Sequence, residues 1–475
     1  MDELRRAGRV AADLAADHLE GIRKRPVWEP VPPGDHRAWL TAQRLPEAGR
    51  TLGELVDDVR DRILPYPMGN GHPRFFGWVN SPPAPAGIVM APLAAALNPS
   101  CAGGDHAGVL LERTVVGWLA ELVGFPHLPG GGLLTSGASM ATIVALASAR
   151  QHAARQDGWD VRVEGLAGHK PMVMYVSDEG HSCIRKAAEL LGLGSRQIRA
   201  VGVDSAFRMD VAALRAMVAE DVAAGLRPFC VAASAGTVNT GAVDPLGAVA
   251  DVAVEHGLWF HVDGAYGALG VVAAGVADGY RGMERADSLA LDPHKWLGVP
   301  VDCGCVLVRD PGAARDAFSL VPAYLRDTDA DEIGWFSEYG IEQSRPFRAL
   351  KVWATMSHLG RAGMVRLVEH TVDLARTLAV AVEAAEDFEL LSPVSTSITA
   401  FRYHPVGQPT DGLDRLNHAI PAAVQRRGRV FITGTRLGGT EALRACFLSR
   451  DTTEDDLVVL LDEIRAAARD VAGSR

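Results

Sequence analysis

The chain has 475 residues, 48% of them hydrophobic and 22% charged, which excludes a disordered chain and a disulfide-stabilised mini-protein. Its 47 Lys and Arg against 58 Asp and Glu give a net charge of −11, so general binding to nucleic acid or to an anionic membrane is not expected. The six cysteines form no CxxC pair. We therefore expect no metal site, and reduced, mostly buried thiols in a cytoplasmic protein.

Residues 1–78 are expected to form an N-terminal helical arm. Residues that are mostly apolar recur there at spacings of three and four, which predicts a helix with one apolar face: Leu4, Ala7, Ala11, Leu14, His18 and Ile22. After a proline-rich connector, Thr51 and Glu54 form a capping box ahead of a second helix that reaches Ile63. Two helices make a poor core, so we expect the arm to pack on the main body or on a second subunit.

The segment from Phe75 to Gly104 carries no charged side chain. Five prolines would repeatedly break a helix that spans a membrane. We therefore expect this segment to be an uncharged loop, either buried or at an interface, and we expect no membrane partner.

Helical and strand patterns alternate between about residues 130 and 310. Short apolar runs predict strands at 172–177, 198–203, 229–234, 258–262 and 303–308, with helices at 138–155, 181–192, 210–224 and 244–256. This order is typical of an α/β fold, so we expect a large, mostly parallel sheet domain over 79–355, whose ligand lies beyond the carboxyl ends of the strands. The pattern over 356–475 predicts a smaller α+β C-terminal domain.

The sharpest chemical signal is Asp292-Pro293-His294-Lys295-Trp296. A lysine in such surroundings is expensive to desolvate, and desolvation supplies the neutral amine that Schiff-base chemistry needs. From these residues alone, a surface lysine after a turn is about as probable.

A second signal is the small-residue turn at 130–139, which contains Thr135-Ser136-Gly137-Ala138-Ser139 and precedes a helix. Backbone N–H groups at such a turn can bind a phosphate. Taken alone, a turn that merely caps a helix is the commoner case. The glycines at 264–270 are only a weak lookalike of a dinucleotide-binding loop.

Two further residues follow strands. Asp263 ends an apolar strand, and a buried carboxylate there needs a cation, either a protonated ring nitrogen of a ligand or a structural arginine. His181 begins a helix after a strand, and it could stack on a flat cofactor or be an ordinary N-terminal histidine.

Five motifs occur in an order and spacing that resemble one family: TSGAS, EGHSCIRKA, ASAGTVNTGAVDP, HVDGAYGA and DPHKW. Together they resemble the group II pyridoxal-phosphate decarboxylases, the relatives of aromatic-L-amino-acid decarboxylase. The resemblance runs from about His72 to Arg444. It implies the fold type I architecture of aspartate aminotransferase, a PLP-dependent transferase-like fold, and pyridoxal 5′-phosphate as cofactor.

The resemblance also implies roles for the motif residues. Lys295 would hold the cofactor covalently, Asp263 would pair with its ring nitrogen, and His181 and Ala265 would lie on its two faces. The remaining cofactor-binding residues would be Ala138, Ser139, Thr237 and His294. Met140 and Val238 stand where many relatives carry Glu and Thr.

On the substrate side, the resemblance points to Trp78, Ser81, Asn98 and Ser100. Tyr324 matches a loop tyrosine that the family uses to protonate the substrate carbon, and the acidic stretch from Tyr324 to Tyr339 is expected to be a solvated loop able to close as a lid. Relatives build their sites across a dimer interface, so a homodimer is expected.

The sequence therefore predicts a decarboxylase that converts an L-amino acid, aromatic or otherwise bulky and hydrophobic, to its amine and carbon dioxide. The catalytic residues would be Lys295, His181, Tyr324 and Asp263. An aldehyde synthase or an aminotransferase with the same fold and lysine is the first alternative. A non-catalytic or dinucleotide-binding protein, in which the glycine turns are only turns, is the second.

Overall fold

The computed structural model describes residues 1–320, 333–407 and 412–473. It divides into two compact units. The large unit comprises residues 79–379 and 392–399, and the small unit comprises residues 1–78, 380–391 and 400–475. The expected division of the chain into an arm and two domains, with boundaries at 78/79 and 355/356, stays a prediction.

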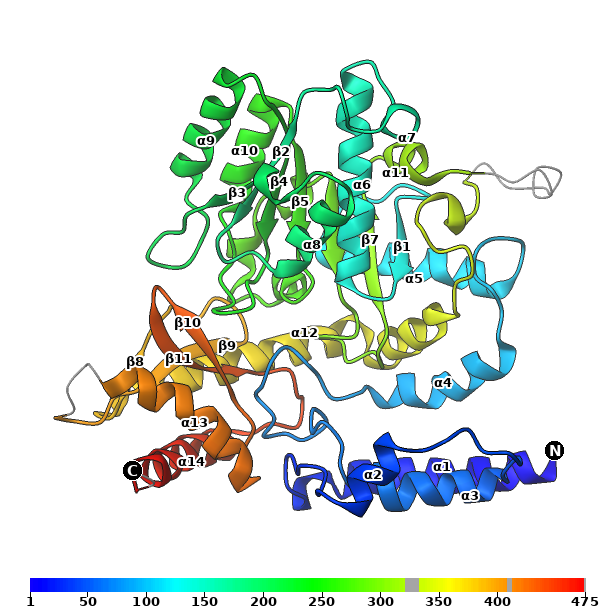
Figure 1. Ribbon diagram of the computed structural model, residues 1–475, viewed down its shortest axis with the longest axis vertical. Helices are drawn as coiled ribbons and strands as arrows, with labels where there is room; N and C mark the ends of the chain where they lie inside the picture. Colours follow the sequence, from blue (N-terminus) through cyan, green and yellow to red (C-terminus); the bar gives the residue numbers. More distant parts are fainter. Residues whose placement is uncertain (321–332, 408–411, 474–475) are drawn as a thin grey trace. The chain divides into compact units, whose positions relative to one another are not determined.

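The large unit is built on a seven-stranded sheet in the order β1-β7-β6-β5-β4-β2-β3 (Figure 1). Strands β3, β2, β4, β5 and β6 are parallel neighbours, whereas β7 is antiparallel to both β6 and β1. The strands are β1 (Gly132–Thr135), β2 (Met172–Ser177), β3 (Ile198–Val201), β4 (Arg227–Ser234), β5 (Trp259–Asp263), β6 (Ser288–Leu291) and β7 (Gly304–Val308). The mostly parallel sheet is confirmed, and β1 and β6 are additions that the sequence patterns did not predict.

Helices cover both faces of this sheet, as the almost continuously buried β4 requires. Helices α9 and α10 pack on β4, while α6 crosses β4 to β7 and also packs against α8 (Figure 1). The helices of the large unit are α4 (Pro85–Leu97), α5 (Ala107–Val123), α6 (Ala138–Gln156), α7 (Val161–Glu164), α8 (Ser182–Leu190), α9 (Val211–Ala223), α10 (Leu246–His256), α11 (Pro311–Phe318) and most of α12 (Arg348–Ala384).

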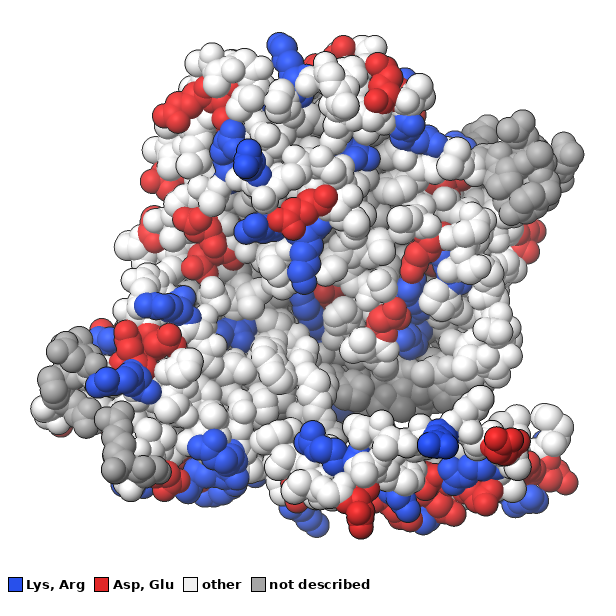
Figure 2. Space-filling view, viewed as in Figure 1, with Lys and Arg blue, Asp and Glu red and all other residues white. Residues whose placement is uncertain are grey.

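Charged side chains are mixed on the surface. On the face drawn in Figure 2, Lys and Arg lie interspersed with Asp and Glu. The six cysteines are free and buried, as expected. Over the described ranges, none of the helices is long and apolar enough to cross a membrane.

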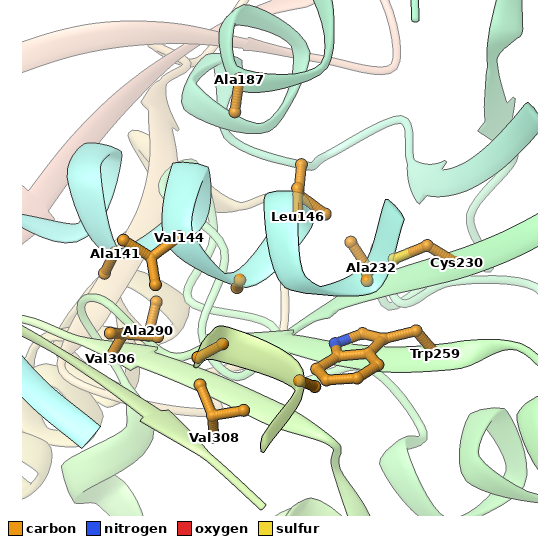
Figure 3. Close-up of a cluster of buried hydrophobic side chains, with 14 of the residues drawn as sticks. Ala141, Val144, Leu146, Ala187, Cys230, Ala232, Trp259, Ala290, Val306 and Val308 are labelled. Atoms are coloured by element: carbon orange, nitrogen blue, oxygen red, sulfur yellow. The ribbon is translucent and has the colours of Figure 1, made fainter. Parts of the chain in front are cut away.

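The central core lies between α6 and the sheet. Ala141 and Val144 of α6 point toward Ala290 of β6 and Val306 of β7 (Figure 3). All four residues are at most 1% exposed. Small side chains let the helix approach the strands closely, so this packing holds the first turn of α6 near the ends of β6 and β7.

The expected uncharged loop over 75–104 is wrong for its middle part, because α4 is a helix. Pro85 occupies the first turn, where a missing N–H costs nothing, and one proline inside the helix, Pro92, is tolerated. The helix is also not buried within the chain: Val89, Leu93 and Leu97 are 62%, 51% and 67% exposed.

The small unit has the expected α+β character, with a four-stranded sheet in the order β10-β11-β9-β8. Its N-terminal part contains the predicted capping box, in which Thr51 accepts from the Glu54 N–H and Glu54 accepts from the Thr51 N–H. The elements are α1 (Asp2–Glu20), α2 (Asp35–Thr41), α3 (Leu52–Asp58), β8 (Phe388–Leu390), β9 (Ile398–Tyr403), α13 (Leu413–Arg427), β10 (Thr433–Leu437), β11 (Thr440–Cys446) and α14 (Glu454–Gly473).

Candidate active site

A cavity of about 330 Å³ opens at the carboxyl ends of the parallel strands in the large unit. Its lining contains all eight residues that the resemblance assigns to the cofactor: Ala138, Ser139, His181, Thr237, Asp263, Ala265, His294 and Lys295. They come from five separate segments, which lie at or just after the carboxyl ends of β1, β2, β4, β5 and β6. Parallel strands bring their carboxyl ends to one edge of a sheet, and β1 shares this direction because two antiparallel steps separate it from β6.

Hydrogen bonds of the Lys295 backbone and of its two neighbours fix the position of Lys295. The backbone N–H of Lys295 donates to the Asp292 carbonyl at 2.9 Å and closes a turn after β6. Nδ1 of His294 accepts from the Cys303 N–H at 3.2 Å, and the indole of Trp296, which is 1% exposed, donates to Thr371 Oγ1 at 2.8 Å. These bonds leave the Lys295 side chain directed into the cavity, where its Nζ lies 3.1 Å from Oδ2 of Asp292.

Asp263 is the last residue of β5 and is 7% exposed. Its Oδ1 accepts from the Ala265 N–H at 3.1 Å, and its Oδ2 lies 4.0 Å from the Cys183 thiol. Within the described parts of the chain, no Lys or Arg forms an ion pair with it. Among the described residues there is thus no arginine partner, and the buried carboxylate needs a cation.

His181 caps α8. Its Nδ1 accepts from the Cys183 N–H at 3.2 Å, so the neutral ring carries its proton on Nε2. Partial burial lowers the pKa of His181, which favours this neutral form. Burial likewise lowers the pKa of His294, whose Nδ1 is also an acceptor.

The first turn of α6 offers backbone donors to the cavity. Its N-cap residue, Gly137, provides no side-chain bond to the helix, and no acidic residue lies in the first turn. Gly304 of β7 packs tightly against this turn, because a Cβ on Gly304 would lie 2.5 Å from the Cα of Gly137. The helix start is thus fixed at one end of the cavity, where N–H groups and Ser139 can meet an anion.

The residues predicted for the substrate are not among those that line the cavity. Ser81 is buried, and its hydroxyl donates to the His294 carbonyl at 3.0 Å. Asn98 and Ser100 are exposed just after α4. Trp78 belongs to the small unit, where it packs near Phe75 and Phe431. Tyr324 lies outside the described residues, so its role stays a prediction.

Other lining residues had received no role from the sequence, among them Cys183, Tyr266 and Asp292. Each lies inside one of the five motifs, so motif membership was the available signal. The ring of Tyr266 stacks on Trp296 at a centroid distance of 5.1 Å, and its hydroxyl bonds Ser397 Oγ at 2.5 Å. Tyr266 therefore connects the segments after β5 and β6.

The donor set of the cavity fits pyridoxal 5′-phosphate. A helix N-terminus suits the phosphate, a lysine within the same cavity suits the aldehyde, and the carboxylate of Asp263, which forms no ion pair with a described residue, suits a protonated ring nitrogen. The volume lies at the lower end of the range of about 300 to 1,000 Å³ that is usual for small-molecule sites.

Comparison with known proteins agrees with this fit. Residues 33–404 match the pyridoxal-dependent decarboxylase conserved domain. The chain is 34% identical to an aromatic-L-amino-acid decarboxylase of Bacillus atrophaeus, over 99% of this chain and 96% of that protein, and 30% identical to a phenylacetaldehyde synthase of Arabidopsis thaliana, over 96% and 93%.

A crystal structure of Oryza sativa TDC with PLP and tryptamine superposes with a TM-score of 0.91 at 26% identity, covering 99% of this chain and 98% of that one. The expected fold type I architecture is therefore confirmed. The chain belongs to the pyridoxal-dependent decarboxylase family, as a PLP-dependent amino-acid decarboxylase.

Proposed function

We propose that this decarboxylase acts on an aromatic or similarly bulky hydrophobic L-amino acid, with Lys295 and Asp263 as its central catalytic groups. The observation that carries the assignment is the presence, in one cavity at the carboxyl ends of the strands, of this lysine and of this buried carboxylate, which has no cationic partner among the described residues. The similarity to the Bacillus atrophaeus enzyme over nearly the full length of both chains supports the substrate class.

When bound, the cofactor supplies an electron sink for the pair released as the bond from Cα to the carboxylate breaks. Lys295 holds the cofactor through its amine, and its anchored neighbours keep that amine in place. Asp263 keeps a positive charge on the ring nitrogen, because a buried carboxylate strongly favours a cation beside it. The first turn of α6, with Ala138 and Ser139, binds the phosphate.

His181 and Ala265, which both line the cavity, would contact the cofactor ring in this proposal. With its Nδ1 engaged by the Cys183 N–H, the neutral His181 presents only an N–H donor, at Nε2, toward the cavity. That N–H would donate to the substrate carboxylate and hold it in place. Carbon dioxide then leaves, and Tyr324 returns a proton to Cα to complete the amine.

The proposal is tested with a panel of L-amino acids that includes Trp, Tyr, Phe, Leu, His and Glu, with amine and carbon dioxide measured together. We expect one amine per carbon dioxide from the aromatic members and little from Glu. Turnover restricted to Glu or to small polar amino acids would overturn the substrate class while leaving the decarboxylase in place.

A second outcome is supported by the similarity to the Arabidopsis thaliana phenylacetaldehyde synthase. In that case the same site would yield aldehyde, ammonia and hydrogen peroxide, with dioxygen as the oxidant. We place it second because Tyr324 supplies the proton donor that favours the amine. Peroxide measured alongside amine in air-saturated buffer separates the two outcomes.

We also propose a homodimer in the cytoplasm. The exposed apolar side chains of α4 would be covered by a second copy of the chain, which would bring Asn98 and Ser100 toward the partner's cofactor. The six free cysteines are typical of a reducing compartment.

A further inference from the structure

Asp292 is a buried carboxylate at the end of the cavity where α6 begins, and it is 5% exposed. Its Oδ1 accepts a hydrogen bond of 2.6 Å from the backbone N–H of Ala138. Its Oδ2 lies 3.1 Å from Nζ of Lys295 and 3.6 Å from Nε2 of His294. Because α6 has no side-chain cap from Gly137, Asp292 is the anion that the start of this helix already holds.

The charges that line the cavity do not balance. Among the lining residues that the structure describes, two carboxylates, Asp263 and Asp292, face a single amine, that of Lys295. The neutral form of His294 adds no positive charge to offset this excess, because it carries a single ring proton, at Nε2. A phosphate at the start of α6 adds between about 1.5 and 2 negative charges at neutral pH. The carboxylate of Asp292 would then lie beside another anion, with little water between them to screen the repulsion.

We propose that Asp292 competes with the cofactor's phosphate for the first turn of α6, and so limits the affinity of this chain for PLP. This inference rests on the proposed placement of the phosphate. Oδ1 uses a backbone donor that the phosphate could otherwise use, and Oδ2, which lies 3.1 Å from Nζ of Lys295, adds negative charge at the same end of the cavity. An asparagine at this position keeps an acceptor for the Ala138 N–H and replaces the charged oxygen with an N–H donor. An asparagine side chain, which has nearly the same shape, would then attract the phosphate through this N–H donor.

The test compares PLP with pyridoxal, which has the same ring and aldehyde but no phosphate. Both are titrated into the full-length chain stripped of cofactor, and binding is followed by the absorbance of the adduct at Lys295 and by tryptophan fluorescence. For Asp292→Asn we expect the ratio of PLP affinity to pyridoxal affinity to rise by about tenfold or more over wild type. The ratio isolates the phosphate, because any effect of the substitution on Lys295 acts on both ligands.

Asp263→Asn is the matched control, since it removes the same charge from the same cavity at the ring end. It should not raise the ratio. A ratio in Asp292→Asn that equals or falls below the wild-type value would overturn the inference. If the wild-type chain forms no adduct at Lys295 with either ligand, the proposed site itself is wrong, and the inference falls with it.

Discussion

The carboxylate of Glu112 and the guanidinium of Arg345 form an ion pair in which each side chain is only 1% exposed. Both groups also bind the backbone of Leu134 in β1: Glu112 accepts from its N–H at 2.9 Å, and Arg345 donates to its carbonyl. Arg345 further donates to the Cys101 carbonyl at 2.8 Å. The pair thus fixes the short strand that leads directly into the proposed phosphate turn.

We expect Arg345→Met to lower the free energy of unfolding by about 3 to 5 kcal/mol, because it leaves a buried carboxylate without its cation. The affinity for PLP should fall as well, since β1 positions the turn at 136–139. Urea denaturation of the holoenzyme measures the first effect. The control is Arg361→Met, which breaks a surface pair with Glu121 whose side chains are 63% and 75% exposed. A loss below about 1 kcal/mol in Arg345→Met would contradict this account.

Lys295→Ala should abolish the borohydride-reducible linkage to the cofactor while leaving the fold intact. The chain has only five lysines, and Lys295 is the lysine that lines the cavity. The measurement is absorbance before and after reduction, followed by mass spectrometry of the modified peptide. Lys186→Ala, on α8, should retain the linkage. A reducible adduct in Lys295→Ala would show that another lysine holds the cofactor.

Stability should fall in mild acid because of buried histidines. Burial lowers the pKa of His261 to about 4, below the value of 6.5 for an exposed histidine. As the pH falls, the unfolded chain therefore takes up this proton before the folded chain does. The stability that His261 contributes is complete above pH 6.5 and is lost progressively as the pH falls to 4. This difference in pKa between the folded and unfolded states corresponds to about 3 kcal/mol in the free energy of unfolding.

We expect His261→Gln to flatten the dependence of the urea midpoint on pH between 6.5 and 4. His72, whose pKa burial also lowers to about 4, should account for part of the slope that remains. His418→Asn serves as the control, because its side chain is 78% exposed. If the slopes of wild type and His261→Gln coincide, His261 is not a source of the acid sensitivity.

The sequence predicted the sheet of the large unit well because β2 to β5 and β7 are apolar runs bounded by helical patterns. It did not predict β1 and β6, which have four residues each. The residues of β1 were interpreted as part of a glycine-rich turn, and β6 directly precedes the DPHKW motif. It also missed α4, because prolines usually end helices, although Pro85 stands in the first turn, where proline is favoured.

That the eight residues proposed for the cofactor line one cavity could be predicted, because each lies in a short motif at the end of a strand. Their electrostatic partners could not. Asp292 bonds Ala138 across 154 positions of sequence, and Arg345 pairs with Glu112 across 233. Such contacts depend on how the strands are ordered in the sheet, which local patterns do not specify.

A charge placed on the exposed face of α4 should dissociate the proposed dimer. Leu93 and Leu97 are 51% and 67% exposed, so Leu93→Asp with Leu97→Asp costs little within the chain but would place two charges in an apolar interface. Sedimentation should shift from dimer to monomer, with loss of activity. Leu190→Asp, at a residue of α8 that is 71% exposed, should leave the dimer intact. An active wild-type monomer at nanomolar concentration would refute the proposed assembly.

Tyr324→Phe should change the product of the reaction while leaving cofactor binding and carbon dioxide release largely in place. The phenol is the proposed proton donor to Cα, so its removal leaves the electron pair at that carbon without a ready proton. Dioxygen can then take the electrons: amino acid, dioxygen and water give aldehyde, carbon dioxide, ammonia and hydrogen peroxide. The measurement is the yield of amine, aldehyde and peroxide per carbon dioxide in air, for wild type, Tyr324→Phe and a Tyr403→Phe control. An unchanged amine yield in Tyr324→Phe would remove this tyrosine from the mechanism and move the proton-donor role to His181 or to a bound water.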